Sequence, residues 1–372
     1  MKTLLIFHLL LLAPSSTILH AQPIIEPITQ NPDAVLLRRI WTVTGSDGDR
    51  VGQGCGPVGD INGDSITDFA VQYGTEQRWK VFVGGSPAPS ILPITSIPSL
   101  APYPAFPVYG KFYGDDRLLV GFGSHTFKTL NGTNVGFYHL KFYQPDAQTG
   151  LSNEPVMVVE PDPDMADPVL LIAPSTAVAI NMDHQAGDEL LLALQSVRRG
   201  DSVYKRPEYW LYRGGSTFQV DTPDYVVRDT EPTTDQGLFT AKVMDLDGDR
   251  YMDLLSLAKY AEGFKLKLWF GTETSPWTWT TPDREVLLDD SSGLNYHLTV
   301  GDFDGDKVMD YAGTAGRDAT RGTYIYLSRS GKSVRQRSFI RSDADRWFPN
   351  LDQYTIGIAG SLLNTTAYLN DS

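Results

Sequence analysis

Acidic side chains recur at alternate positions in three short stretches, in the order Asp-x-Asp/Asn-x-Asp-x-x-x-Asp. Side chains at alternate positions of a tight loop can converge on one point, where Ca²⁺ takes about six to eight oxygen ligands. Mg²⁺ requires a more rigid octahedron and Zn²⁺ prefers nitrogen and sulfur, so the pattern favours calcium, at about three sites. The predicted ligands are the side chains of Asp60, Asn62, Asp64, Asp68, Asp245, Asp247, Asp249, Asp253, Asp302, Asp304, Asp306 and Asp310, with the backbone carbonyls of Ile66, Tyr251 and Val308.

A set of polar Asx turns without any ion is the simplest alternative for one such stretch. Three complete copies at the same place in a repeat favour metal binding over that alternative. The EF-hand loop begins with the same spacing, but it needs an acidic residue at position 12 and helices on both sides. Position 12 is Val71, Ser256 or Gly313 here, and a strand pattern follows each loop. A glycine at the fourth position permits the sharp turn because it can adopt positive φ. These glycines are Gly63, Gly248 and Gly305.

The three stretches belong to a longer repeat. Each copy runs from an apolar residue through the acidic loop into a short apolar run, and an aromatic-rich strand pattern follows. The loop segments are 58–71 (VGDINGDSITDFAV), 243–256 (VMDLDGDRYMDLLS) and 300–313 (VGDFDGDKVMDYAG), and the second strand patterns are 80–86, 267–272 and 323–328.

Two degraded copies and one faint copy extend the repeat along the chain. The degraded loops are at 111–118 and 181–188, and the faint copy is at 359–371, against complete loops at 60–68, 245–253 and 302–310. Repeats of four short strands at a period of roughly 50 residues build β-propellers. We therefore expect an all-β fold, a propeller of four-stranded antiparallel blades over residues 22–372. The length predicts about six blades, with five to seven compatible.

Composition agrees with that fold class. The chain has 34 glycines, 24 prolines and many aromatic residues, and no segment shows sustained helical periodicity, as expected of an all-β protein. Cys55 is the only cysteine, so no internal disulfide can form. Stability must then come from core burial, bound metal or both.

The first 21 residues predict a cleaved signal peptide. Lys2 precedes an apolar run at 4–12 that is too short to span a bilayer, and small residues lead to Ala21. We therefore expect secretion, to the extracellular space or the periplasm. Loss of Lys2 changes the formal charge from −14 to −14 − 1 = −15, which disfavours nucleic acid as a partner.

The complete copies resemble FG-GAP (VCBS-like) repeats, the units of integrin-α-type propellers. That resemblance implies loops that bind calcium at one face of the propeller and a role in adhesion. The two degraded loops contain only part of the ligand set, so we do not predict calcium at their five polar residues. They are Asp115, Asp116, Asn181, Asp183 and Asp188.

Function is less determined than fold. The chain contains no nucleophile elbow, HExxH zinc motif or phosphate-binding glycine loop. We expect a monomeric secreted scaffold that binds an extracellular protein or glycan. A carbohydrate-active lyase or hydrolase, or a structural repeat of a larger envelope assembly, remains an alternative. Trp277 or Trp279 could present an exposed ring to a ligand. The integrin-recognised tripeptide at 199–201 is most simply a chance match in a surface turn.

Overall fold

The computed structural model describes residues 51–349, except for short internal segments of which the longest are 99–106, 160–169, 289–296 and 316–321. The predicted signal peptide at 1–21 and the faint repeat at 359–371 lie outside the described residues. Among the residues that are described, no helix is long and apolar enough to cross a membrane.

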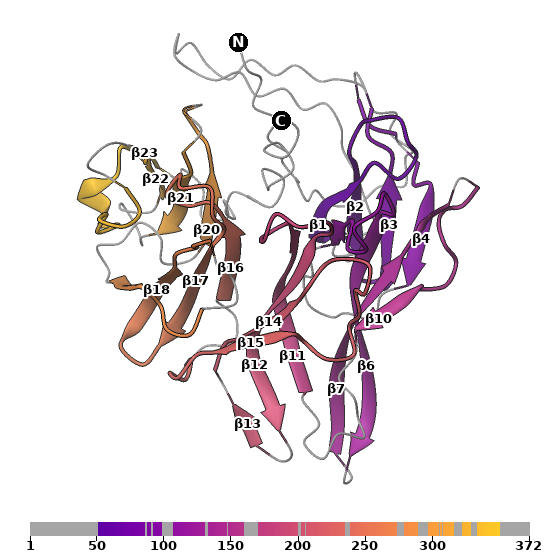
Figure 1. Cartoon of the computed structure of the whole chain (residues 1–372), viewed down its shortest axis with the longest axis horizontal. Helices are drawn as coiled ribbons and strands as arrows, with labels where there is room; N and C mark the ends of the chain where they lie inside the picture. The colour runs from indigo at the N-terminus through magenta and orange to yellow at the C-terminus, as the bar shows by residue number, and fades with distance from the viewer. Residues whose placement is uncertain are drawn as a thin grey trace. The chain divides into compact units, whose positions relative to one another are not determined.

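Antiparallel strands make up nearly all of the regular structure (Figure 1). The first sheet contains β1 (Val51–Gly59), β2 (Asp68–Tyr73), β3 (Arg78–Phe82) and β4 (Thr95–Pro98). The second contains β5 (Val108–Gly110), β6 (Leu119–Leu130), β7 (Thr133–Tyr143) and β10 (Met157–Val159). The third contains β11 (Leu170–Ile180), β12 (Glu189–Arg199), β14 (Glu208–Tyr212) and β15 (Tyr225–Arg228), with β13 (Ser202–Tyr204) paired to β12.

Two further four-stranded sheets follow in the same order. The fourth contains β16 (Phe239–Met244), β17 (Asp253–Tyr260), β18 (Gly263–Trp269) and β19 (Arg284–Leu288). The fifth contains β20 (His297–Gly301), β21 (Asp310–Ala315), β22 (Gly322–Tyr326) and β23 (Arg346–Pro349). A small hairpin of β8 (Pro145–Asp146) and β9 (Gly150–Leu151) and a 3-10 turn at Arg341–Asp343 complete the described elements.

Four strands that pair in chain order form the blade of a β-propeller, so the predicted fold class is confirmed. The prediction of about six blades is too high, because the described residues form five. The sixth was inferred partly from chain length. The extra hairpin β8–β9, the added strand β13 and the long strands β6 and β7 use residues that a uniform repeat would have assigned to another blade.

The chain divides into two compact units. One comprises the residues up to Tyr109 together with Val120–His125 and Lys141–Met157. The other comprises Gly110–Leu119, Thr126–Leu140 and the residues from Val158 onward. The second unit contains the third, fourth and fifth sheets complete, and it holds two of the three complete acidic loops.

Burial explains the different residue patterns of inner and outer strands. Five of the eight residues of β17 are apolar, and seven of the eight are buried because neighbouring sheets cover both faces. Trp269 on β18 packs edge-on against Tyr209 of the third sheet, with ring centroids 5.5 Å apart. The outer strand β19 alternates instead, and its Leu287 is 53% exposed. The core of this unit therefore lies between the faces of successive sheets.

A buried ion pair fixes the connection between the third and fourth sheets. Asp229, just after β15, accepts hydrogen bonds at 2.9 Å on each carboxylate oxygen from the Lys267 ammonium of β18. The Tyr260 hydroxyl donates a further hydrogen bond to Asp229 Oδ2 at 2.6 Å. Lys267 is only 2% exposed and Asp229 only 7%. Each charge is therefore acceptable in the interior only while its partner is present.

Candidate metal centre

Each complete acidic loop connects the first and second strands of its sheet, which are β1–β2, β16–β17 and β20–β21. Gly63 and Gly248 have φ of +79° and +84°, so the prediction that the fourth position needs positive φ is confirmed for these two loops. Gly305 lies outside the described residues. In both the first and the fourth sheet, the first aspartate of the loop accepts hydrogen bonds from backbone N–H groups within the loop. Asp60 accepts from Gly63, Asp64 and Ser65, and Asp245 accepts from Gly248, Asp249 and Arg250.

The last aspartate of each loop makes the same two hydrogen bonds in all three copies. One carboxylate oxygen accepts from the backbone N–H at the second loop position, and the other accepts from the backbone N–H of a residue two positions beyond the third strand. Asp253 accepts from Leu246 at 2.8 Å and from Gly271 at 2.5 Å; Asp68 from Ile61 at 2.8 Å and Gly84 at 2.7 Å; Asp310 from Phe303 at 2.7 Å and Ser328 at 2.8 Å. These carboxylates tie each loop to the far end of its own sheet.

Burial raises the pKa of the last aspartate in each complete loop. Asp68, Asp253 and Asp310 are each 0% exposed. Desolvation by burial, aided by the other carboxylates of each loop, raises the pKa of Asp253 to about 8 and that of Asp310 to about 6, and it raises the pKa of Asp68 as well. The two backbone hydrogen bonds offset only part of this effect. A bound cation would favour the ionised form in every case.

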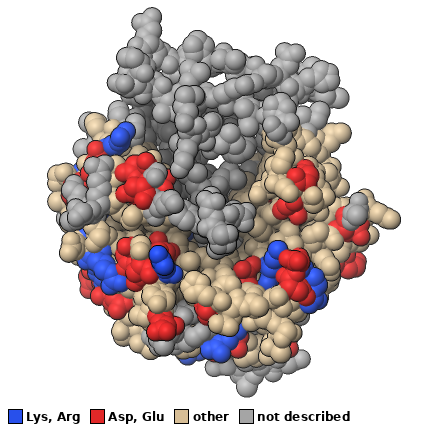
Figure 2. Space-filling model, turned by 45° about the horizontal axis from the view of Figure 1, so that its top comes forward, with Lys and Arg blue, Asp and Glu red and all other residues tan. Residues whose placement is uncertain are grey.

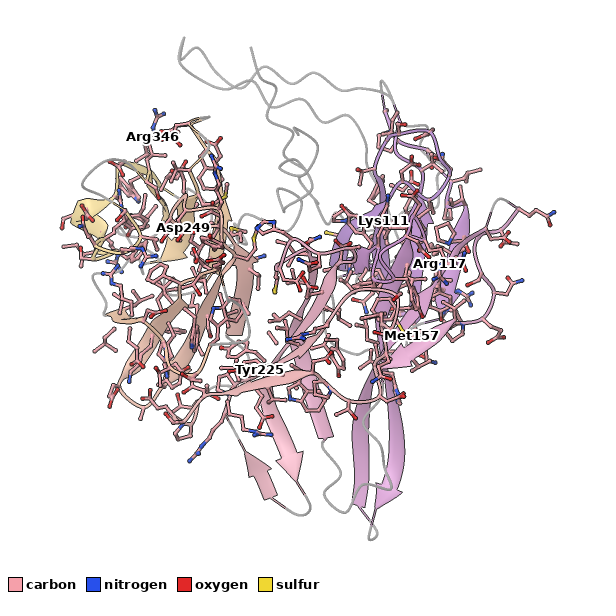
Figure 3. All side chains as sticks on the ribbon, viewed as in Figure 1. Lys111, Arg117, Met157, Tyr225, Asp249 and Arg346 are labelled. Carbon is pink, nitrogen blue, oxygen red and sulfur yellow. The ribbon has the colours of Figure 1, made fainter. Side chains whose placement is uncertain are left out.

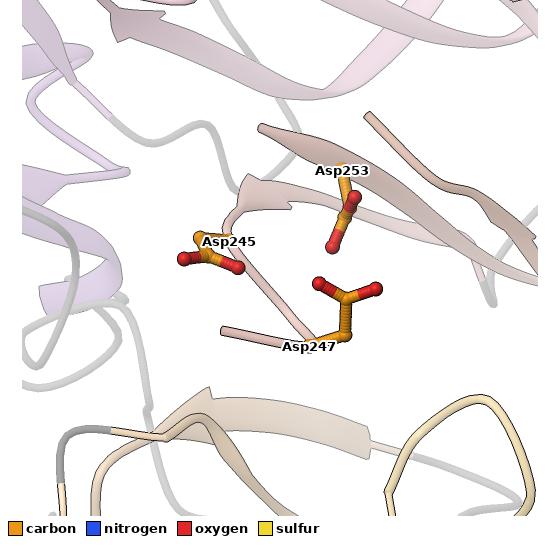
Figure 4. Close-up of side chains that lie close together, drawn as sticks. All are labelled: Asp245, Asp247 and Asp253. Carbon is orange, nitrogen blue, oxygen red and sulfur yellow. The ribbon is translucent and has the colours of Figure 1, made fainter. Parts of the chain in front are cut away.

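Two of the three loops bring three carboxylates together. Asp245, Asp247 and Asp253 offer oxygen atoms that all lie within 4.8 Å of one another, and Figure 4 shows these side chains directed toward a common space. In the fifth sheet, Asp302, Asp304 and Asp306 form such a group, with the fifth loop position in place of the ninth. Carboxylate oxygens at that spacing can hold a metal ion. Asp249 and Asp310, which were predicted as ligands, do not belong to these groups.

In the first loop, three carboxylates do not meet in this way, although the whole loop is described. This loop carries an amide at the third position, where both other loops carry a carboxylate, and Asn62 Nδ2 donates a hydrogen bond to Asp64 Oδ2 at 3.0 Å. The residues predicted to offer a backbone carbonyl occupy the seventh position of each loop. In all three loops the N–H group of this residue donates to the aspartate at the fifth position. Ile66 donates to Asp64, Tyr251 to Asp249 and Val308 to Asp306, at 2.8 to 2.9 Å.

The degraded loop of the third sheet keeps the fold of the complete loops, with glutamate in place of the last aspartate. Glu189 accepts from Met182 N–H at 2.6 Å and from Gly214 N–H at 3.2 Å. The predicted loop at 181–188 lies between β11 and β12, and Glu189 is the first residue of β12. The neighbouring Asp188 carboxylate accepts from Lys111 N–H at 2.6 Å instead. The glycine pair at 214–215, which matches the one at 84–85, was the signal that could have located Glu189.

The degraded loop of the second sheet contains its own positive charges. Lys111 occupies the place of the first aspartate, and its ammonium lies 2.9 Å from Asp116. Arg117 Nε lies 2.7 Å from Asp115, and both basic residues are labelled in Figure 3. These carboxylates therefore pair with basic side chains of their own loop.

Figure 2 shows the wider charge pattern on one face of the molecule. Acidic side chains gather there in separate patches, and basic side chains lie beside several of them. Because the negative charge is concentrated in these patches, a cation close to a patch interacts strongly with its carboxylates.

Two aromatic predictions have different outcomes. Trp279 is 3% exposed and belongs to the core between the third and fourth sheets, so it cannot present its ring to a ligand. Trp277 lies outside the described residues, as do Gly200 and Asp201 of the tripeptide at 199–201. Trp347 on β23, which sequence reasoning missed, is 47% exposed.

The glycine that follows the third strand provides a test of the loop geometry. A Cβ atom on Gly84 would lie 2.3 Å from the Thr67 carbonyl oxygen, a contact that requires the backbone to move. We expect Gly84→Ala to reduce the free energy of unfolding by about 1–3 kcal/mol. The control is Gly301→Ala, where the nearest atom would be at 3.5 Å. Chemical denaturation measures both, and equal stability of the two variants would contradict the described packing.

Neither a scan against protein-family models nor a search of curated proteins finds a match to this chain. The FG-GAP resemblance thus rests on the repeated residues alone.

Proposed function

We propose that this chain is a secreted calcium-binding β-propeller that acts as a binding scaffold for an extracellular protein or glycan. The observation that carries the proposal is the repeated loop, in which clustered carboxylates follow the first strand of a blade and the last one is tied to the end of the third strand. Calcium would neutralise the cluster and stabilise both connections at once.

The donor set decides which metal fits. The three complete loops contain carboxylate and amide oxygens and neither histidine nor cysteine. Such all-oxygen sites suit a hard cation, and flexible loops suit Ca²⁺ better than Mg²⁺. In the loop of the fourth sheet the ligands would be Asp245, Asp247 and Asp253, and in that of the fifth Asp302, Asp304 and Asp306. In the first loop the ligands would include Asp60, Asn62 and Asp64, which carry one carboxylate fewer than the corresponding residues of the other loops.

Removal of calcium is expected to lower the melting temperature of the protein. An ion that binds only the folded state adds stability in proportion to the logarithm of its concentration over its dissociation constant. Without it, the crowded carboxylates of each loop repel one another. Differential scanning calorimetry of metal-loaded protein, with and without EGTA, measures the change. An unchanged melting temperature would argue against a structural role for calcium.

Asp304→Ala is expected to reproduce part of that effect, because it removes one ligand from the fifth-sheet loop while the other sites stay intact. The same substitution should make the protein less sensitive to EGTA. Asp343→Ala is the matched control, since Asp343 lies in the 3-10 turn of the same sheet, outside the acidic loops. Equal losses of EGTA sensitivity in both variants would refute the assignment.

The binding role predicts a ligand that depends on calcium. Trp347 offers an exposed ring that lies beside the buried Tyr324, with centroids 6.3 Å apart, and an exposed tryptophan suits both sugars and protein partners. A glycan and protein array probed with and without EGTA should give ligands that are lost on chelation and weakened by Trp347→Ala. Turnover of a polysaccharide, abolished by one carboxylate substitution outside the loops, would favour the lyase or hydrolase alternative instead.

A further inference from the structure

An arginine of the fifth sheet lies against the acidic loop of the fourth sheet. Arg335 belongs to the connection between β22 and β23, 88 residues along the chain from Asp247. Its Nε lies 2.5 Å from Asp247 Oδ2, and its Nη2 lies 3.7 Å from Asp249 Oδ2. The guanidinium carbon also lies 3.9 Å from the ring centre of Phe270. Three separate contacts thus hold the positive charge at the edge of the carboxylate cluster.

The backbone around Arg335 is anchored on both sides. Val334 is 0% exposed in the core between the fourth and fifth sheets. The guanidinium of Arg284, on the outer strand of the fourth sheet, donates to the carbonyls of Val334 and Arg337. Arg337 is itself 3% exposed and pairs with Asp345 at 3.1 Å. The place of Arg335 is therefore fixed by buried neighbours, unlike that of an arginine on a free surface loop.

The carboxylate that Arg335 contacts is also a predicted metal ligand. The Asp247 side chain is only 5% exposed, and it belongs to the cluster with Asp245 and Asp253. In the fifth-sheet loop, no basic side chain of the described residues contacts Asp304 or Asp306. Among the described residues, the contact with Arg335 therefore distinguishes Asp247 from Asp304, the aspartate at the same loop position.

We propose that Arg335 is a built-in competitor for the divalent cation of the fourth-sheet loop. Without the ion, the guanidinium neutralises Asp247; when the ion binds, it displaces the guanidinium from that carboxylate. This inference rests on the proposed calcium function. It adds that the fourth-sheet loop binds calcium with lower affinity than the fifth-sheet loop does. The fourth-sheet loop then responds to the calcium concentration after the other is already occupied.

Charge repulsion between a guanidinium and a divalent ion that share one carboxylate gives the expected size of the effect. Removal of a partly exposed ion-pair partner changes affinity by roughly two- to fivefold. Arg335→Gln should therefore tighten calcium binding in the fourth-sheet loop by about that factor. The Arg346→Gln variant serves as the control, because Arg346 is an exposed arginine on β23, and Figure 3 labels it with Asp249.

Isothermal titration of calcium into the chelated full-length chain tests the inference. An Asp60→Asn/Asp304→Asn background leaves the fourth-sheet loop with its predicted ligands, and an Asp60→Asn/Asp247→Asn background does the same for the fifth-sheet loop. Arg335→Gln should lower the dissociation constant in the first background and leave it unchanged in the second. An unchanged or weaker affinity in the first background would overturn the competition.

A direct readout comes from the Nε–H resonance of Arg335 in NMR spectra, identified by its loss in Arg335→Gln. Calcium should shift this resonance away from its hydrogen-bonded position, and a resonance that calcium leaves unmoved at saturation would overturn displacement. If calcium binds none of the loops in the unsubstituted protein, the proposed function fails together with this inference. If calcium binds but Arg335→Gln has no effect, only the inference fails.

Discussion

Replacing Lys267 by methionine is expected to lower the free energy of unfolding by about 3–5 kcal/mol, the cost of leaving a buried charge without its partner. Asp229 would keep its hydrogen bond from Tyr260 but lose both contacts to the ammonium. Methionine preserves most of the side-chain volume, so the change isolates the charge. Urea denaturation followed by tryptophan fluorescence measures the difference.

Lys265→Met is the matched control for that experiment. Lys265 is on the same strand, but its ammonium pairs with Glu231 and the exposed Glu262, and such pairs contribute about 1 kcal/mol or less. A second test is the double variant Lys267→Met/Asp229→Asn, in which a neutral amide replaces the orphaned carboxylate. We expect it to recover part of the lost stability. Equal losses in Lys267→Met and Lys265→Met would show that the ion pair is not buried as described.

The second large effect is expected from Asp253→Ala. This substitution leaves the N–H groups of Leu246 and Gly271 without their acceptor, and each buried unsatisfied group costs about 1–3 kcal/mol. We therefore expect a loss of about 2–5 kcal/mol, measured in EGTA so that loss of a bound ion does not contribute. The loop would also separate from the end of β18.

Asp249→Ala in the same loop is the control for Asp253→Ala. Its carboxylate is 38% exposed and accepts one hydrogen bond, from Tyr251 N–H. We expect a loss near or below about 1 kcal/mol in EGTA, because water can replace that single bond. If the two variants lost the same stability without metal, the last aspartate would have no special role in connecting the loop to the sheet.

The strand order of the blades could be predicted from the sequence because the repeat marks it directly. The patterns at 80–86, 267–272 and 323–328 correspond to β3, β18 and β22, displaced by a few residues. The displacement arises because strand ends are set by the partner strand and not by local residue preference. The prediction that a strand, and not a helix, follows each acidic loop was also correct. The blade count was not, since chain length does not distinguish a blade from an inserted hairpin.

The site could be predicted only in part. Alternating aspartates identified the loops, but spacing alone did not show that Asn62 holds Asp64 or that Asp249 faces Arg335 rather than the cluster. Glu189 stands at the ninth loop position, as the last aspartates do, but it was missed because glutamate replaces aspartate there and Asp188 precedes it. Arg335 is distant in sequence and carries no motif, so its contact with Asp247 emerges only from the packing of the fourth and fifth sheets.

Whether the three complete acidic loops bind calcium can be measured by isothermal calorimetry, with calcium titrated into the chelated mature chain. We expect saturable binding of up to three ions, with the sites lost one at a time in Asp60→Asn, Asp247→Asn and Asp304→Asn. We also expect a weaker class of site that disappears in Asp247→Asn. Absence of saturable binding, or binding that none of these substitutions changes, would contradict the assignment of the loops as calcium sites.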